Sequence, residues 1–331
     1  MQISIIICST GKRIKELNNL LHSIYKQNIE PYEIIFIFQG NIEKLKIINL
    51  INSVSNTYHK SSIKIKYYFY QHKSLAWGKN IGGKLADGNS DWLLFLDDDV
   101  ELMNDFIKKL IDGAKRYEGA KILFGRIENL KESNYIYNIF ARIFKLPIHK
   151  LNSGFKVLKS FKTTYDVNCD NDKIADWASG GASLVKKHLI KEFKYDDNLI
   201  LYSFNEDLDF SYRVSKKYKN SIWYISNARL IHHEANLGRL NRDNLSIMKT
   251  LYDYYLFHKN KKLDLNYGSY LISELALLFA TAIAEIIRFQ APYSFFGLLK
   301  SYYYLIKYNK DLKRGDLKRV NSMLLQLNNQ V

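Results

Sequence analysis

The chain has 331 residues, enough to bury a core in one large domain or two smaller ones, and its 47% apolar and 25% charged residues exclude a disordered chain. Lys and Arg number 49 against 33 Asp and Glu, so the formal charge of +16 favours anionic partners such as phosphorylated ligands or an acidic membrane surface. The sequence has neither an arginine-rich arm nor an aromatic RNA-binding motif, so no nucleic-acid partner is expected.

Two cysteines, Cys8 and Cys169, are too few for a disulfide framework and lack the spacing of metal ligands. They indicate a reducing compartment, and Cys8 is expected to be buried because it lies in an apolar run. That run is too short for a signal peptide and has no basic segment before it. The sequence therefore predicts a cytoplasmic protein.

Apolar runs rich in β-branched residues alternate with helical periodicity over the first hundred residues. Strands are predicted at 3–8, 33–38, 63–70 and 92–96, and helices at 14–24, 42–54 and 78–86. This alternation predicts an α/β fold with a mainly parallel central sheet between helices. Such sheets bind ligands at the carboxyl ends of their strands.

The pattern changes after residue 129. Residues 129–172 are irregular, aromatic and basic, which predicts a long insertion. A late strand is predicted at 222–231, and the chain beyond Leu240 is expected to be mostly helical.

The apolar stretch 271–287 in this helical tail is interrupted by Glu274 and Glu285. A membrane-spanning helix needs about 20 predominantly apolar residues, so two other arrangements are expected. The stretch packs against the main domain, or it lies in a membrane interface as an amphipathic helix. The second arrangement would be helped by nearby basic residues, which are Arg288, Lys300, Lys307, Lys313 and Arg314.

Three carboxylates in a row, Asp97, Asp98 and Asp99, directly follow the strand predicted at 92–96. Like charges at close range repel, and a divalent cation that prefers oxygen ligands, such as Mn²⁺ or Mg²⁺, would relieve this cost. Alternate residues of an extended segment face the same side, so Asp97 and Asp99 can act together. The alternative is a solvated acidic turn that caps a helix beginning near Asn104.

The segment from Leu96 to Asp99 resembles the DxD motif of the family-2 inverting glycosyltransferases, which share the GT-A fold. Residues 79–82, Lys-Asn-Ile-Gly, are similar to the Arg-Asn-x-Gly of that family, and residues 205–213 resemble its Glu-Asp-x-Asp-x-x-x-Arg segment. The resemblance extends over roughly residues 3–235. It implies a metal-dependent transfer of a sugar from a nucleotide diphosphate donor to an acceptor hydroxyl.

The resemblance also implies roles for residues of the acidic segment. Asp207 would be the catalytic base, with Glu206 beside it, and Asp97, Asp99 and His232 would bind the metal. His233 is the other candidate, since strand alternation lets only one of the two histidines face the site. The alternative for the acidic segment is a surface helix in which Asp209 and Arg213 form an ion pair.

Donor contacts are implied for residues that follow the predicted strands. Two of them depart from the family pattern: Gln39 stands where an aspartate is usual, and Lys79 replaces an arginine, which keeps the charge but loses bidentate geometry. The full donor set is Ser9, Thr10, Arg13, Gln39, Lys73, Lys79, Asn80, Asp97 and Asp98. Trp177, Gly180 and Gly181 are expected to contact the acceptor, because paired glycines permit close approach and an indole can stack on a sugar.

Taken together, these features predict a GT-A catalytic domain over 1–238, with a nucleotide-binding half at 1–99 and an acceptor-binding half at 100–238, and a helical region over 239–331. The expected reaction moves a sugar from UDP- or dTDP-sugar to a glycan or lipid-linked acceptor in surface polysaccharide synthesis, at the inner face of the membrane. Two alternatives are a sugar-1-phosphate nucleotidyltransferase and a non-catalytic sugar-nucleotide or glycan-binding protein. The single glycine in residues 9–13 disfavours the first, and intact Asp97, Asp99 and Asp207 disfavour the second.

Overall fold

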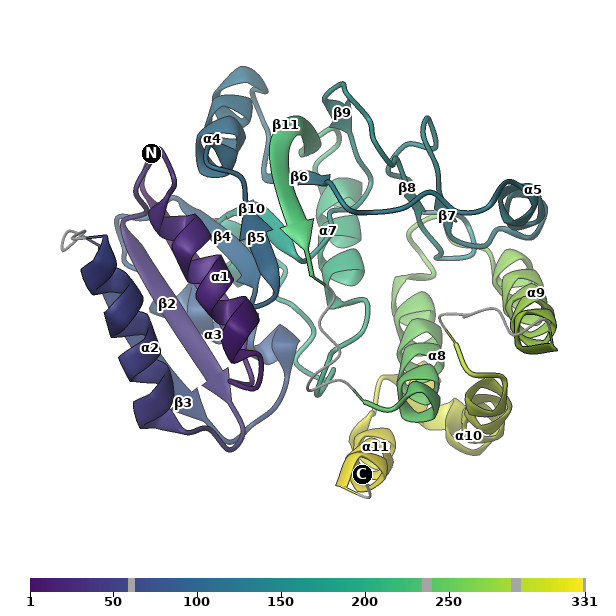
Figure 1. The fold of residues 1–331 in the computed structure, drawn as a ribbon. Helices are drawn as coiled ribbons and strands as arrows, with labels where there is room; N and C mark the ends of the chain where they lie inside the picture. The colour runs from purple at the N-terminus through teal and green to yellow at the C-terminus, as the bar shows by residue number, and fades with distance from the viewer. Residues whose placement is uncertain (59–62, 234–239, 287–292, 330–331) are drawn as a thin grey trace. The chain divides into compact units, whose positions relative to one another are not determined.

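The computed structural model describes residues 1–58, 63–233, 240–286 and 293–329 (Figure 1). The chain forms two compact units. We call them the sheet unit, which comprises residues 1–131, 167–197 and 206–238, and the helical unit, which comprises 132–166, 198–205 and 239–331. The helical unit thus includes segments 132–166 and 198–205 as well as the chain after residue 238, and the predicted division into catalytic domain and helical region stays a prediction.

A central sheet organises the sheet unit, with strand order β3-β2-β1-β4-β10-β6-β11-β5, and β9 pairs with β11. The first four strands are parallel, whereas β10 is antiparallel to both of its neighbours, β4 and β6. The strands are β1 (Ile3–Ser9), β2 (Glu33–Gln39), β3 (Lys64–Tyr70), β4 (Trp92–Asp97), β5 (Val100–Leu102), β6 (Ile122–Ile127), β9 (Lys173–Ile174), β10 (Ala182–Lys186) and β11 (Ile222–His232).

Helices cover both faces of this sheet, as strand alternation requires. Ile5 and Ile7 pack on the face covered by α1 and α2, while Ile6 points to the opposite face and contacts α3 at Gly82, where an added Cβ would collide with it. Figure 1 shows α1 and α2 in front of the sheet and α3 behind it. The helices of this unit are α1 (Ile14–Tyr25), α2 (Lys44–Thr57), α3 (Leu75–Leu85), α4 (Phe106–Arg116), α6 (His188–Glu192) and α7 (Glu206–Lys217).

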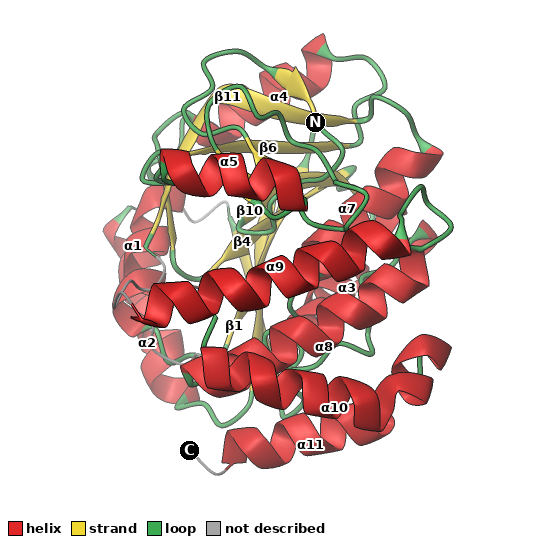
Figure 2. Cartoon of the chain, turned by 90° about the vertical axis from the view of Figure 1, so that its right-hand side faces the viewer, coloured by secondary structure: helices red, strands yellow, loops and turns green. Residues whose placement is uncertain are grey.

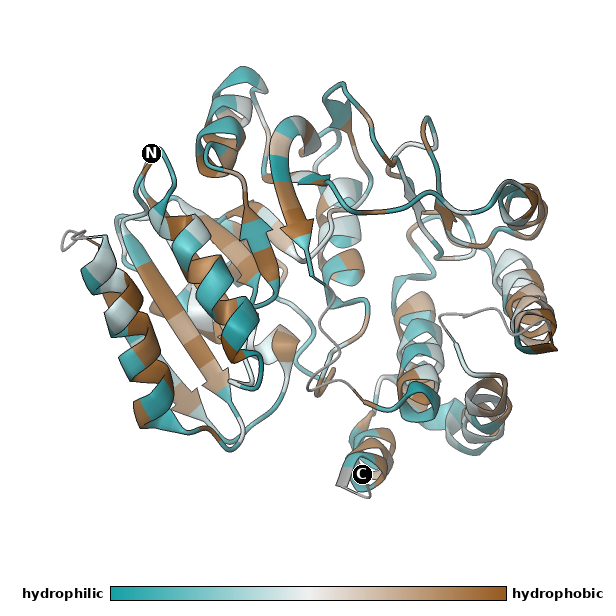
Figure 3. Cartoon of the chain, in the orientation of Figure 1, coloured by the Kyte–Doolittle hydropathy of each residue, from teal (hydrophilic) through white to brown (hydrophobic). Residues whose placement is uncertain are grey.

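The predicted alternation of strands and helices up to residue 97 is confirmed, and so are the late strand and the helical tail. Figure 3 shows why: the strands of the sheet are hydrophobic along most of their length. The short strands β5 and β6 were not predicted. Cys8 lies near the carboxyl end of β1, where the residue is half-buried and burial raises the pKa of its thiol to about 12, and Cys169 is buried.

The helical unit is built from α5 (Tyr135–Phe144), α8 (Arg242–Asn260), α9 (Tyr267–Ile286), α10 (Phe295–Arg314) and α11 (Lys318–Asn329), with the strand pair β7 (Ile148–His149) and β8 (Thr164–Tyr165). The insertion joins this unit because α5 is amphipathic and buries Ala141 in a cluster with Ala276 and Leu277 of α9 and Leu298 of α10. Among the residues that the structure describes, α9 is the one helix long and apolar enough to cross a membrane.

A buried ionic cluster ties the insertion to two helices of this unit. Lys162 Nζ donates to Asp253 of α8 at 2.5 Å and to Glu274 of α9 at 2.7 Å, and all three side chains are almost fully buried. Asn205 Nδ2 also donates to Asp253, at 3.1 Å. Burial raises the pKa of Asp253 to about 6, against the lowering influence of the Lys162 charge. One lysine thus compensates two carboxylates inside the helical unit.

We expect Lys162→Met to lower the free energy of unfolding of this unit by about 3 kcal/mol near pH 8, because two buried carboxylates lose their cation. A carboxyl whose pKa is raised in the folded protein binds a proton more readily there than in the unfolded chain. The loss in free energy of unfolding caused by Lys162→Met should therefore shrink as the pH falls from the raised pKa of the folded carboxyl toward the ordinary pKa of the unfolded one. Urea unfolding followed by circular dichroism at several pH values measures this.

Lys159→Met is the matched control for that variant, since Lys159 is an exposed lysine three residues away. It should change the free energy of unfolding by less than about 0.5 kcal/mol. A Lys162→Met deficit that is equally small, or that grows on acidification, would contradict the role given to the cluster.

Candidate active site

The carboxylates that follow β4 are held by the hydroxyl of Ser9, which ends β1, and by the guanidinium of Arg13 in the loop after it. Asp98 accepts from Ser9 Oγ at 2.5 Å and from Arg13 Nη1 at 3.0 Å, and the same Arg13 nitrogen donates to Asp99 at 2.8 Å. Asp98 and Asp99 are buried, whereas Asp97 is half-buried. Because β1 and β4 are adjacent and parallel, their carboxyl ends bring these residues together across about 85 positions of sequence.

Burial of these acids changes how readily they ionise. It raises the pKa of Asp98 to about 6, even though the Arg13 charge and the Ser9 hydrogen bond both lower it. Burial also raises the pKa of Asp97, to which the neighbouring Asp99 charge adds, while Lys79 opposes the shift. The site therefore holds more negative charge than its surroundings solvate well, and a further cation would be bound favourably there.

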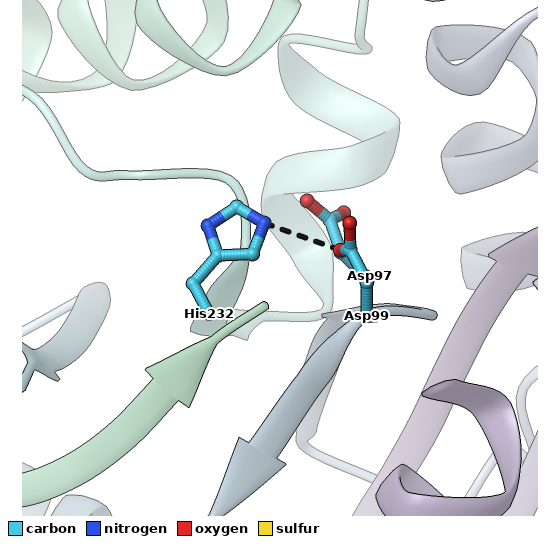
Figure 4. A group of neighbouring side chains, drawn as sticks. All are labelled: Asp97, Asp99 and His232. Atoms are coloured by element: carbon cyan, nitrogen blue, oxygen red, sulfur yellow. Dashed lines mark hydrogen bonds and ion pairs between the residues drawn. The ribbon is translucent and has the colours of Figure 1, made fainter. Parts of the chain in front are cut away.

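Asp97, Asp99 and His232 form a group with the geometry of a metal site (Figure 4). One ligand atom from each lies within 4.8 Å of the other two, and His232 Nε2 is 3.1 Å from Asp99 Oδ1. His232 ends β11, where the side chain of Asn129 bonds both its backbone N–H (3.0 Å) and its carbonyl (2.7 Å). His233 faces elsewhere and lies 3.0 Å from Glu101 Oε2. Of the two histidine candidates, the structure places His232 with the carboxylates.

The two acids at the start of α7 have different surroundings. Glu206 is buried and accepts a hydrogen bond from the buried Lys79 Nζ at 2.9 Å. Burial raises the pKa of Glu206 to about 7, while the Lys79 charge opposes this change. Asp207 is half-buried, and its Oδ2 accepts from the backbone N–H of Gly180 at 2.7 Å. Asp207 can therefore reach a ligand, whereas Glu206 is engaged with Lys79.

The Gly180–Gly181 turn joins the acidic pair to the metal group. A Cβ added to Gly180 would lie 3.0 Å from Asp207 Oδ2, and one added to Gly181 would lie 3.6 Å from Asp97 Oδ2. The carbonyl of Gly181 also accepts from the N–H of Asp97 at 2.9 Å. Asp207 and Asp97 thus lie on either side of one narrow turn, in a single site.

Two predicted donor ligands have their polar atoms engaged elsewhere. The amide of Gln39 bonds the backbone N–H and carbonyl of Ser74, at 3.2 and 2.8 Å. The amide of Asn80 bonds both backbone groups of Tyr195 at 2.9 Å and also donates to Asp197. Both side chains hold loops in place through these contacts, and the donor contacts expected for Gln39 and Asn80 stay predictions.

The remaining predicted residues lie around the same strand ends. Gly40 follows β2 and has a φ of +92°. The aliphatic side chain of Lys73 packs against it, in the space that a Cβ at position 40 would occupy. Thr10 and Trp177 are half-buried. The turn after Trp177 is held by the Ala178 N–H, which donates to Ser211 at 3.1 Å.

Asp209 and Arg213 form the expected ion pair, at 2.8 Å, but the pair is not confined to the helix surface. Asp209 is fully buried, and Arg213 also donates to the carbonyls of Phe193 and Lys194, each at 2.7 Å. Asn129, which fixes the backbone of His232, was not among the residues predicted for the site. It follows β6, a strand that was not predicted, so no signal marked its position.

Comparison with known proteins gives a consistent result. The family model for glycosyl transferase family 2 matches residues 4–170, and no curated protein matches the chain. The structure of GalNAc-T7 with UDP, GalNAc and Mn²⁺ is similar, with a TM-score of 0.55 and 15% identity over 92% of this chain and 57% of that one. The mannosyltransferase PcManGT from Pyrobaculum calidifontis, in complex with GDP-Man and Mn²⁺, gives 0.52 and 13% over 98% and 84%.

S. aureus TarS matches 85% of this chain with a TM-score of 0.48 and 14% identity. The chain spans only 42% of the length of TarS and 57% of that of GalNAc-T7. The two likenesses above 0.5 show the GT-A fold, and the family match covers half of the chain, including the first four strands and the aspartates after β4. The chain therefore belongs to glycosyl transferase family 2.

Proposed function

We propose that this glycosyltransferase is a metal-dependent inverting enzyme that moves a sugar from a UDP- or dTDP-sugar to a hydroxyl of a glycan or lipid-linked acceptor. The observation that carries the proposal is the Gly180–Gly181 turn, which has Asp207 on one side and Asp97 on the other. This arrangement suits a base and a donor site that act on one sugar. Relatives of the same fold have been seen with UDP or GDP-Man and with Mn²⁺.

Asp97, Asp99 and His232 would hold Mn²⁺ or Mg²⁺. Carboxylate oxygens suit both ions, and the raised pKa values of Asp97 and Asp98 indicate that an added cation would be favourable beside them. A bound ion would supply electrostatic stabilisation of the leaving diphosphate. Arg13 and Lys79 bring further positive charge to the same group of acids.

Asp207 acts as the general base in this proposal. It takes the acceptor's hydroxyl proton as the acceptor oxygen forms a bond to the anomeric carbon, and the bond from that carbon to the diphosphate oxygen breaks. The N–H of Gly180 fixes one carboxylate oxygen of Asp207. Glu206 and Lys79 are positioning residues here, because they are bonded to each other and buried beside Asp207.

The donor nucleotide binds over the ends of β1 and β2 in this proposal, near Ser9, Thr10, Arg13 and Lys73, and Asp98 orders that loop through Ser9 and Arg13. Gln39 and Asn80 support the same region through Ser74 and Tyr195. Trp177 lies on the acceptor side.

We also propose that the protein works at the inner face of a membrane in surface polysaccharide synthesis, which the charge of +16 and the apolar helix α9 support.

A thermal-shift screen of UDP-, dTDP- and GDP-sugars, with and without Mn²⁺, tests the donor class. At a ligand concentration 100 times Kd, the folded state gains about 2.7 kcal/mol, so one donor class should raise the Tm in a metal-dependent way. If no nucleotide sugar raised the Tm, but nucleoside triphosphate and sugar-1-phosphate gave pyrophosphate, the nucleotidyltransferase alternative would replace this proposal.

Asp207→Asn should reduce transfer by about 10²- to 10⁴-fold and leave donor binding close to that of the parent, because the amide keeps the shape but cannot accept the proton. Transfer is followed as nucleotide diphosphate release in the presence of acceptor, and donor binding by calorimetry. Transfer at the parent rate would show that Asp207 is not the base.

Gly180→Ala and Gly181→Ala form a matched pair of neighbouring substitutions. The methyl at 180 would press on Asp207 and lie 3.1 Å from Lys79 Nζ, whereas the nearest atom to the methyl at 181 is 3.6 Å away, an ordinary contact. We expect Gly180→Ala to lower kcat by about 10²-fold through misplacement of the base, with little effect on Tm. Gly181→Ala should retain most activity, and equal losses in both variants would contradict this geometry.

His232→Ala and His233→Ala compare adjacent histidines that face different groups. We expect Mn²⁺ affinity, measured by electron paramagnetic resonance or calorimetry, to fall at least about tenfold for His232→Ala only. The His233 side chain contacts Glu101 and not Asp97 or Asp99, so its loss should leave metal binding unchanged. A larger effect at His233 would overturn the ligand assignment.

A further inference from the structure

One side of helix α9 is packed against the helical unit, and the other side is exposed. Leu271, Leu275, Phe279, Ile283 and Ile286 recur every three or four residues, and their exposed fractions run from 42% to 80%. This spacing places them in a single stripe along the helix. The opposite side packs into the cluster that contains Ala276 and Leu277. The apolar stripe of α9 therefore faces away from the core of the helical unit.

Both carboxylates of α9 have hydrogen-bond and cationic partners within the helical unit. Glu274 is buried and bonded to Lys162, and Glu285 accepts from the Phe295 N–H at 2.9 Å and lies 3.4 Å from Arg242. Every exposed side chain along the described length of α9 is uncharged. A helix of 20 residues is about 30 Å long, so the stripe is a long surface without charge.

Helix α5 widens this surface. Ile136, Ile139 and Ile143 are exposed by 47% to 75% and also recur at helical spacing. Figure 2 shows α5 beside α9, and both helices contribute to one apolar cluster.

Helix α10 widens it on the other side. Phe296, Leu299, Tyr303 and Ile306 are exposed by 44% to 81%, while Leu298 packs with α9. We call the exposed apolar stripes of α5, α9 and α10 the apolar face. Exposed apolar stripes on three helices that share one core cluster differ from the single exposed apolar side chains common on soluble proteins, and they indicate an interaction site.

The exposed charged side chains on these three helices are cations, one of which, Lys300, lies 3.9 Å from Asp243 of α8. The three helices carry six exposed cations, which are Arg142, Lys300, Lys307, Lys310, Lys313 and Arg314. Their carboxylates are Glu274, Glu285 and Asp311, and Asp311 lies 3.2 Å from Arg319, so each has a cationic partner. Arg142, Lys300 and Lys307 directly adjoin stripe residues in sequence. Such side chains can lay their stems on an apolar layer and keep their charges at lipid phosphates.

We propose that the apolar face binds the surface of an anionic lipid bilayer, with α9 lying in the membrane interface. Spanning is excluded by the inner side of α9, which stays packed on the unit and bonded to Lys162. The two arrangements expected as alternatives for this stretch are then compatible: one side of α9 packs on the helical unit, and the opposite side lies in the membrane interface. This inference rests on the membrane part of the proposed function and makes no use of the catalytic residues. Arg288, expected to help, lies outside the described residues.

Sedimentation of the full chain with vesicles tests the proposal. We expect the protein to sediment with vesicles of equal parts phosphatidylcholine and phosphatidylglycerol, and less with phosphatidylcholine alone, because the cations need anionic head groups. The triple variant Leu275→Ser, Phe279→Ser, Ile283→Ser should weaken partitioning at least about tenfold. Lys300→Gln with Lys307→Gln should reduce binding to the anionic vesicles and narrow the difference between the two compositions, because four of the six cations remain.

Leu45→Ser is the matched control, because Leu45 is 78% exposed on α2 of the sheet unit. It should sediment like the parent, and so should Asp207→Asn, which separates a failure of this proposal from a failure of the catalytic one. Parent protein that stays in the supernatant, or a triple variant that sediments unchanged, would overturn the proposal. A parent dimer that becomes monomeric in the triple variant, measured by light scattering, would also overturn it, since the face would then bind a second copy.

Discussion

Buried negative charge at the carboxyl end of β4 is the constraint on which the sheet unit depends. Asp97, Asp98 and Asp99 cannot all be ionised away from water without compensating partners, and the chain brings a cation and a histidine to them from distant segments. Arg13 comes from the loop after β1, and His232 from the end of β11. Each contact also positions a loop, so the same interactions that compensate the negative charge also set the shape of the site.

The same constraint recurs in the helical unit with a different consequence. Lys162 compensates Asp253 and Glu274, and Arg242 lies close to Glu285, so the acids of α9 have partners within the helical unit. Helix α9 is left with an uncharged outer side. A buried ionic cluster thereby sets the orientation of an amphipathic helix, and with it the surface that we propose contacts lipid.

Lys79 and Glu206 show how a departure from the family motif fits this fold. A lysine at position 79 makes one ion pair at 2.9 Å with a buried glutamate, for which a compact charge on a flexible stem is well suited. The family match ends at residue 170, so Asp207, His232 and the Gly180–Gly181 turn lie beyond it. Their place in the site follows from contacts in the structure.

Local patterns were sufficient to predict the alternation of strands and helices up to residue 97, the three aspartates at the end of β4 and the resemblance to the family, because apolar periodicity and short motifs are local properties of the chain. Only the tertiary structure decided that His232 and not His233 joins Asp99, that Gln39 and Asn80 hold loops, and that segment 132–166 joins the helical unit. It also decided which side of α9 is exposed. These outcomes depend on partners up to about 130 residues away, and no local pattern in the sequence specifies a partner at that distance.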